Sequence, residues 1–153
     1  MPRTTRTRTD APTATRVLVV SSSDDDHAVL HQILNMPEWH LQQAPSLLFA
    51  LRQLRRDPEI SVIVCDCDTR PETWKEMLEN LKLLSDPPLL VVTSRIADEQ
   101  LWAEALNLGA YDVLAKPFDS IEVNRVLTAA SRHSHRDRAP SFDLSRLALA
   151  AAY

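Results

Sequence analysis

The stretch from residue 60 to residue 68, Ile-Ser-Val-Ile-Val-Cys-Asp-Cys-Asp, constrains the fold more than any other part of the chain. It is an apolar, β-branched run that carries charge only at its C-terminal end, which is typical of a buried parallel strand. In open parallel sheets, binding and reacting groups lie just beyond the carboxyl ends of the strands. We therefore expect a functional site at Asp66 and Asp68, with the rest of the sheet built around this strand.

Strand-like and helix-like segments alternate five times along the chain. Short apolar runs predict the strands, and apolar residues at helical spacing behind Ser, Asp or Pro predict the helices. Such alternation predicts an α/β domain, a parallel sheet with helices on both faces and right-handed crossovers. Gly109 is expected to cap the fourth helix. The expected strands cover residues 16–20, 39–44, 60–66, 89–92 and 111–115, and the expected helices begin near Asp24, Ser46, Pro71, Asp98 and Ser120.

The two ends of the chain differ from this domain in composition. Residues 1–15 are rich in Thr, Arg and Pro without an apolar period, which predicts a disordered arm. Residues 16–133 form the predicted domain, and residues 134–153 a tail. Its Ala/Leu-rich segment from Phe142 to Tyr153 has helix propensity but is short for an isolated helix. We leave open whether it frays, docks on the domain or contacts a partner.

Composition excludes several classes of function. The net charge of −4 argues against a nucleic-acid-binding domain. Two cysteines in a C-x-C arrangement are no disulfide framework and fit a reducing, cytoplasmic setting. No apolar run is long enough to span a membrane, and the arginine-bearing N-terminus lacks the apolar core of a secretory signal. The single glycine, Gly109, rules out glycine-rich phosphate loops.

Three successive strand ends carry chemistry: Asp66, then Thr93, then Lys116-Pro117. The stretch from 106 to 118, Leu-Asn-Leu-Gly-Ala-Tyr-Asp-Val-Leu-Ala-Lys-Pro-Phe, is the most specific of these features. Together they resemble the receiver domain of two-component response regulators over residues 16–132. The resemblance implies a flavodoxin-like fold with five parallel strands.

The resemblance also assigns roles to these residues. Asp66 would be the phosphoacceptor, taking a phosphoryl group from the phosphohistidine of a sensor kinase as an acyl phosphate. Thr93 would be the switch hydroxyl, and Lys116 would pair with the carboxylate and then with the phosphate. The bond between Lys116 and Pro117 would be cis. The chain would receive a phosphoryl group and would not be an enzyme in its own right.

The first strand departs from the receiver pattern, because Ser21 and Ser22 stand where the family places two Mg²⁺-binding acids. In an alignment without gaps, the three acids at residues 24–26 lie three residues beyond the positions of that acid pair. We interpret them as the start of a helix. Only Asp66 and Asp68 then remain for a metal, so Mg²⁺ binding is expected to be weak or absent. Val113 also replaces the usual aromatic residue of the switch.

The resemblance and its departures leave two functions open. The first is a stand-alone regulator in a phosphorelay, because the residues after Arg132 are too few for a DNA-binding module. Its partners would be a sensor histidine kinase or another phosphodonor, and a downstream protein bound through the fourth helix, fifth strand and fifth helix. We expect no nucleic acid and no membrane, and leave the oligomeric state open, a homodimer included. The alternative is a pseudo-receiver, an interaction module with weak or no Mg²⁺-dependent phosphorylation.

Two further groups have simpler interpretations than a metal site. Cys65 and Cys67 make only half a zinc site, so buried free thiols are favoured. His27 and His31 are four residues apart on a helix but lack the glutamate of a zinc protease motif. A solvated helix face is the favoured interpretation of this pair.

Overall fold

The computed structural model describes residues 14–137 of the chain, and residues 1–13 and 138–153 lie outside this description. Five strands alternate with five helices in this part, as the sequence pattern predicts. The strands are β1 (Thr15–Val20), β2 (Trp39–Ala44), β3 (Ile60–Asp66), β4 (Leu89–Ser94) and β5 (Asp112–Ala115). The helices are α1 (Asp24–Ile33), α2 (Leu47–Arg56), α3 (Thr73–Leu81), α4 (Glu99–Leu108) and α5 (Ser120–Asp137).

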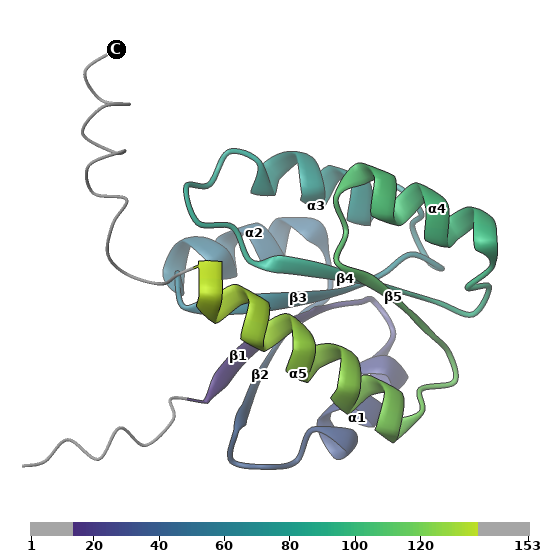
Figure 1. Ribbon diagram of the computed structural model, residues 1–153, viewed down its shortest axis with the longest axis horizontal. Helices are drawn as coiled ribbons and strands as arrows, with labels where there is room; N and C mark the ends of the chain where they lie inside the picture. The colour runs from purple at the N-terminus through teal and green to yellow at the C-terminus, as the bar shows by residue number, and fades with distance from the viewer. Residues whose placement is uncertain (1–13, 138–153) are drawn as a thin grey trace, which may run out of the picture.

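The strands form one parallel sheet in the order β2-β1-β3-β4-β5. Helices α2, α3 and α4 cover one face of this sheet, and α1 and α5 cover the other (Figure 1). The arrangement confirms the predicted flavodoxin-like fold. Strand β3 lies at the centre with all seven residues buried, which explains why its sequence is an unbroken apolar run up to Asp66.

Each face of the sheet has its own apolar core. Trp74 and Met77 of α3 are buried on the face covered by α2, α3 and α4. Leu30 of α1 and Leu127 of α5 are buried on the opposite face. Burying one large apolar side chain stabilises a fold by about 1.5–3 kcal/mol. The two cores therefore fix the sheet from both sides. Helices α1 and α5 are held against the face toward which the Asp66 side chain points.

Helix ends follow the expected capping chemistry. The Ser46 hydroxyl accepts the backbone N–H of Phe49 at the start of α2. The Asp98 carboxylate accepts the N–H of Leu101 at the start of α4. Gly109 ends α4 in the left-handed region, with φ of 106°, where a residue without a Cβ is favoured.

Helix α5 continues past the boundary that the sequence suggested. We placed the end of the predicted domain at residue 133. The structure instead extends α5 to Asp137, and His133 Nδ1 lies 2.8 Å from the Tyr111 hydroxyl. The predicted arm at residues 1–13 and the tail at 138–153 lie outside the described residues. None of the helices between residues 14 and 137 is both long and apolar enough to cross a bilayer.

Candidate functional site

The residues predicted for the site meet at the carboxyl edge of the sheet. Asp66 ends β3, and Thr93 is its register partner on β4. Lys116 follows β5, and its ammonium reaches Asp66. Side chains alternate between the two faces of a strand, so Asp66 continues the side of buried Val64, which faces α1 and α5. A group on the first turn of α1 can therefore reach the same place.

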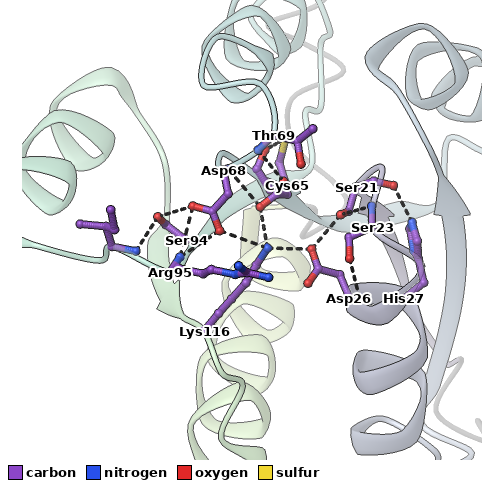
Figure 2. A network of polar contacts seen from close by, with 12 residues as sticks. Ser21, Ser23, Asp26, His27, Cys65, Asp68, Thr69, Ser94, Arg95 and Lys116 are labelled. Carbon is purple, nitrogen blue, oxygen red and sulfur yellow. Dashed lines mark hydrogen bonds and ion pairs between the residues drawn. The ribbon is translucent and has the colours of Figure 1, made fainter.

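Lys116 is the centre of the polar network (Figure 2). Its Nζ lies 2.6 Å from Asp66 Oδ1, 2.7 Å from Asp26 Oδ2 and 3.4 Å from Asp68 Oδ2. All three side chains are largely buried: Lys116 is 10% exposed, Asp26 12% and Asp66 4%. Burial by itself lowers the pKa of Lys116, but the hydrogen bonds to Asp26 and Asp66 raise it above its ordinary value. The ammonium is thus charged at neutral pH.

The Asp66 carboxylate is held by three donors. Besides Lys116, the backbone N–H groups of Asp68 and Thr69 donate to its two oxygens at 3.1 and 3.2 Å. Burial favours the neutral acid, but these donors outweigh it and lower the pKa of Asp66 below its ordinary value. A hollow of about 560 Å³ adjoins this carboxylate. Asp66 is therefore an ionised group of fixed orientation beside an open approach.

Asp26 is a residue of this site that the sequence interpretation missed. The acids at residues 24–26 do begin α1, as predicted, and Ser23 caps the helix by accepting the N–H of Asp26. Asp24 and Asp25 are exposed, whereas Asp26 is buried against Lys116. Its spacing was the available signal: Asp26 precedes buried Leu30 by four residues, so both lie on the inward face of the helix.

The loop after β1 is fixed by contacts that use both oxygens of Ser21. Its hydroxyl donates to Asp26 Oδ2 at 2.7 Å and accepts the Ser23 N–H at 3.1 Å. Its carbonyl lies 2.7 Å from Nε2 of His27, which is buried in the structure. The predicted solvated face is therefore wrong for His27, which instead anchors this loop. His31 is exposed, as expected.

Asp68 joins the loop after β3 to the loop after β4. Its carboxylate accepts the Ser94 hydroxyl at 2.8 Å and the backbone N–H of Arg95 at 3.0 Å. The Ser94 hydroxyl in turn accepts the N–H of Ile96 at 3.0 Å. Ser94 was not singled out from the sequence, where it follows the predicted switch residue Thr93. The loop that a switch would move is thus tied directly to the site.

Comparison with known proteins identifies the family. Residues 17–128 match the family model described as the response regulator receiver domain. The chain belongs to the receiver domain family. Among curated relatives, the rice two-component response regulator ORR5 (Oryza sativa subsp. japonica) is 29% identical over 122 residues, which are 78% of this chain and 90% of ORR5. The regulatory protein VirG of Agrobacterium fabrum is 30% identical over 109 residues, which are 69% of this chain but 42% of VirG.

Solved structures agree with this family. The signal receiver domain of an HD domain-containing protein from Pseudomonas fluorescens has a TM-score of 0.69 at 25% identity, covering 80% of this chain and 98% of that one. A response regulator from Thermotoga maritima has a TM-score of 0.71, covering 78% of this chain and 98% of that one. At 20% identity, the second likeness supports the fold alone.

Receiver domains typically bind Mg²⁺, but the residues of this receiver do not fit that ion. Mg²⁺ prefers carboxylate oxygens and water in octahedral geometry. The Ser21 hydroxyl is engaged with Asp26, and Ser22 is exposed. The Asp26 and Asp66 carboxylates are both occupied by the Lys116 ammonium. No group of three or more metal-ligating His, Cys, Asp or Glu side chains is found within residues 14–137.

The remaining predicted residues take the following places in the receiver. Thr93 is buried at the end of β4, where its carbonyl accepts the Cys67 N–H at 3.0 Å. The peptide bond between Lys116 and Pro117 is cis, as the resemblance implied. Cys65 and Cys67 are buried free thiols, as expected, and burial raises the pKa of both. They are therefore packing residues on the face opposite Asp26.

Proposed function

We propose that this receiver accepts a phosphoryl group on Asp66 from the phosphohistidine of a sensor kinase or from another phosphodonor. One observation carries the proposal: an ionised carboxylate at the end of the central strand is held 2.6 Å from a lysine ammonium, next to an open hollow. Ionisation makes Asp66 a nucleophile, and the ammonium offsets charge that gathers during transfer.

The transfer itself needs few groups from the protein. An Asp66 oxygen forms a bond to phosphorus, the N–P bond of the phosphohistidine breaks, and the released ring nitrogen takes up a proton. Positioning and charge neutralisation supply most of the catalysis in such reactions. Lys116 supplies the charge, and the N–H groups of Asp68 and Thr69 fix the nucleophile. The receiver is the acceptor in this step and does not act as an enzyme on a separate substrate.

The output is proposed to be contact with a downstream protein in the cytoplasm, through the face formed by α4, β5 and α5. Leu106 and Leu108 of α4 and Ile121 of α5 are exposed aliphatic residues on these elements, with Ile121 78% exposed. Exposed aliphatic side chains of this kind suit a protein partner. The bridge from Asp68 to Ser94 and Arg95 connects the site to the loop that leads into α4. We expect no nucleic acid or membrane partner.

Two observations favour the alternative of an interaction module without phosphotransfer. Lys116 is shared between Asp66 and Asp26, so it is not free to move wholly onto an incoming phosphoryl group. The acids of the first strand, which would support such a transfer, are replaced by Ser21 and Ser22. In this case the receiver would bind its partner in a single state.

Labelling with acetyl phosphate or with a phosphorylated histidine kinase, with and without Mg²⁺, separates the two functions. The proposal predicts one phosphoryl group per wild-type chain, measured as intact mass. Asp66→Asn should lose this label. Asp68→Asn should retain it, because that carboxylate lies at the edge of the site and accepts bonds from the β4–α4 loop.

Two results would contradict the proposal. Wild-type protein that gains no label from either donor would support the interaction module. Label that persists in the Asp66→Asn variant would place the acceptor elsewhere.

A further inference from the structure

The serine that replaces an acid after the first strand and an acid of α1 meet in one contact. The first strand supplies Ser21 instead of an acid, and α1 supplies an acid, Asp26, that points into the site (Figure 2). The Ser21 hydroxyl donates to Asp26 Oδ2 at 2.7 Å, and the same oxygen lies 2.7 Å from Lys116 Nζ. A carboxylate at position 21 would have placed a second acceptor against Asp26, whereas the serine supplies a donor. Ser21 and Asp26 therefore fit each other as donor and acceptor.

We propose that Asp26 is a positioning residue that, together with Asp66, holds the Lys116 ammonium as the internal counter-ion of the site, so that the unphosphorylated receiver does not take up Mg²⁺. The inference deepens the proposed function and rests on Asp66 being the centre of the site. It concerns the protein before any phosphoryl group arrives, and can be tested without one.

The ammonium is well placed for this role. It contacts three carboxylates, and the two nearest, Asp26 and Asp66, are largely buried. A buried carboxylate needs a cation or several donors to remain charged, and here Lys116 serves two of them at once. The attraction acts over less than 3 Å on each side. Repulsion between the two carboxylates is weaker, because the ammonium lies between them.

A divalent cation would have to displace this arrangement. Mg²⁺ binds carboxylate oxygens at short range and keeps several waters, which requires room around the carboxylates. Each near carboxylate already spends one oxygen on Lys116 and accepts other donors as well: Ser21 on Asp26, and two backbone N–H groups on Asp66. Freeing them would leave the Lys116 ammonium without its two closest partners. Mg²⁺ would therefore compete with Lys116 for the same carboxylate oxygens of Asp26 and Asp66.

The test is a titration of the folded, unphosphorylated receiver with Mg²⁺ alone. The readouts are the NMR signals of the backbone amides of Asp68 and Thr69, which donate to Asp66, and the melting temperature Tm. Wild-type protein should show no saturable change up to about 10 mM, well above the dissociation constant of a weak natural cation site. Lys116→Met removes the ammonium and leaves the carboxylates uncompensated. This variant should gain Mg²⁺ binding, with Tm rising by about 4 °C at ten times the dissociation constant.

Two matched controls test whether the effects are specific to Lys116 and to Asp26. Lys82→Met removes an ammonium that pairs with Glu79 on the surface, and should gain no response to Mg²⁺. In the Lys116→Met background, Asp26→Asn should abolish the gained response. Asp25→Asn, an equal change of charge on an exposed neighbour in the same helical turn, should preserve it.

Saturable Mg²⁺ binding by the wild-type protein, seen at Asp68 and Thr69, would overturn the inference whatever the variants do. A folded Lys116→Met variant that ignores Mg²⁺ would also overturn it, as would a gained response that Asp26→Asn leaves intact. If Lys116→Met unfolds without metal, its refolding on addition of Mg²⁺ but not of NaCl at equal ionic strength supports the inference, and failure to refold counts against it. Absence of phosphorylation would leave these binding results unchanged, so the two proposals fail separately.

Discussion

Replacing Lys116 by methionine should destabilise the fold far more than the loss of an ordinary surface lysine. The substitution preserves much of the apolar stem but deletes the only cation within 4 Å of Asp26 and Asp66 among the described residues. Removing one partner of a buried ion pair costs about 3–5 kcal/mol, because the remaining charge is left without compensation. The Lys116 side chain is 10% exposed, so solvent can recover little of this loss.

The measurement is urea unfolding at pH 7, followed by tryptophan fluorescence, to which buried Trp74 contributes, and by circular dichroism. Lys82→Met, which breaks an exposed pair with Glu79, should change the free energy of unfolding by less than about 1 kcal/mol. Adding Asp66→Asn to Lys116→Met should restore part of the stability, since one unpaired carboxylate is then gone. A Lys116→Met variant as stable as Lys82→Met, or a double variant less stable than the single one, would refute the reasoning.

Four further predictions each concern a single residue. The folded pKa of Asp66 is lowered, so its stabilising contribution should be present above the unfolded value of about 3.9 and be lost as pH falls through the folded value. The folded pKa of Lys116 is raised, so its stabilising contribution should be complete below about pH 10.4 and be lost as pH rises further. On the acid side, Asp66→Asn should weaken the fall of stability with pH in a pH–stability curve. An unchanged acid limb would count against the pairing of Asp66 with Lys116. Asp26→Asn should cost about 1.5 kcal/mol more than Asp25→Asn in urea unfolding, because only Asp26 makes a charge-assisted bond, and equal losses would contradict that bond. Gly109→Ala should cost about 1–2 kcal/mol in the same assay, because an alanine is strained at φ of 106°. A Cβ there would meet no atom within 4 Å, so this cost reflects the backbone conformation alone. A neutral effect would mean that this cap is not left-handed in solution.

The fold could be predicted because its signals are local. Strand β3 was expected at 60–66 and is found at Ile60–Asp66, since an apolar β-branched run flanked by turns has few other solutions. Gly109 was expected to end α4, and its left-handed conformation is the physical reason for a glycine there. Helix α5 extends beyond residue 133, where we placed the end of the domain, although the apolar period fades after Ala130. The polar residues beyond it contain no proline or glycine to stop a helix, and Ser134 is still buried.

The site could be predicted only where its residues follow strands. Asp66 and Lys116 lie at strand ends, and parallel strands bring such ends together, so their contact was expected. Asp26 was missed because its position in the first turn of a helix already had an explanation, the helix dipole. Its direction depends on how α1 packs on the sheet, and only the four-residue spacing to buried Leu30 hinted at it. His27 was misjudged because its partner is a backbone carbonyl, which no side-chain pattern reveals.

The most direct test of the central claim is to locate the phosphoryl group chemically. After incubation with acetyl phosphate or a phosphorylated kinase, sodium borohydride reduces an aspartyl phosphate to homoserine, which peptide mass spectrometry can place in the chain. We predict homoserine at position 66 in the wild-type receiver and at no position in the Asp66→Asn variant. Homoserine at Asp26 or Asp68, or none in wild-type protein that a competent donor has treated, would contradict the claim that Asp66 is the phosphoacceptor.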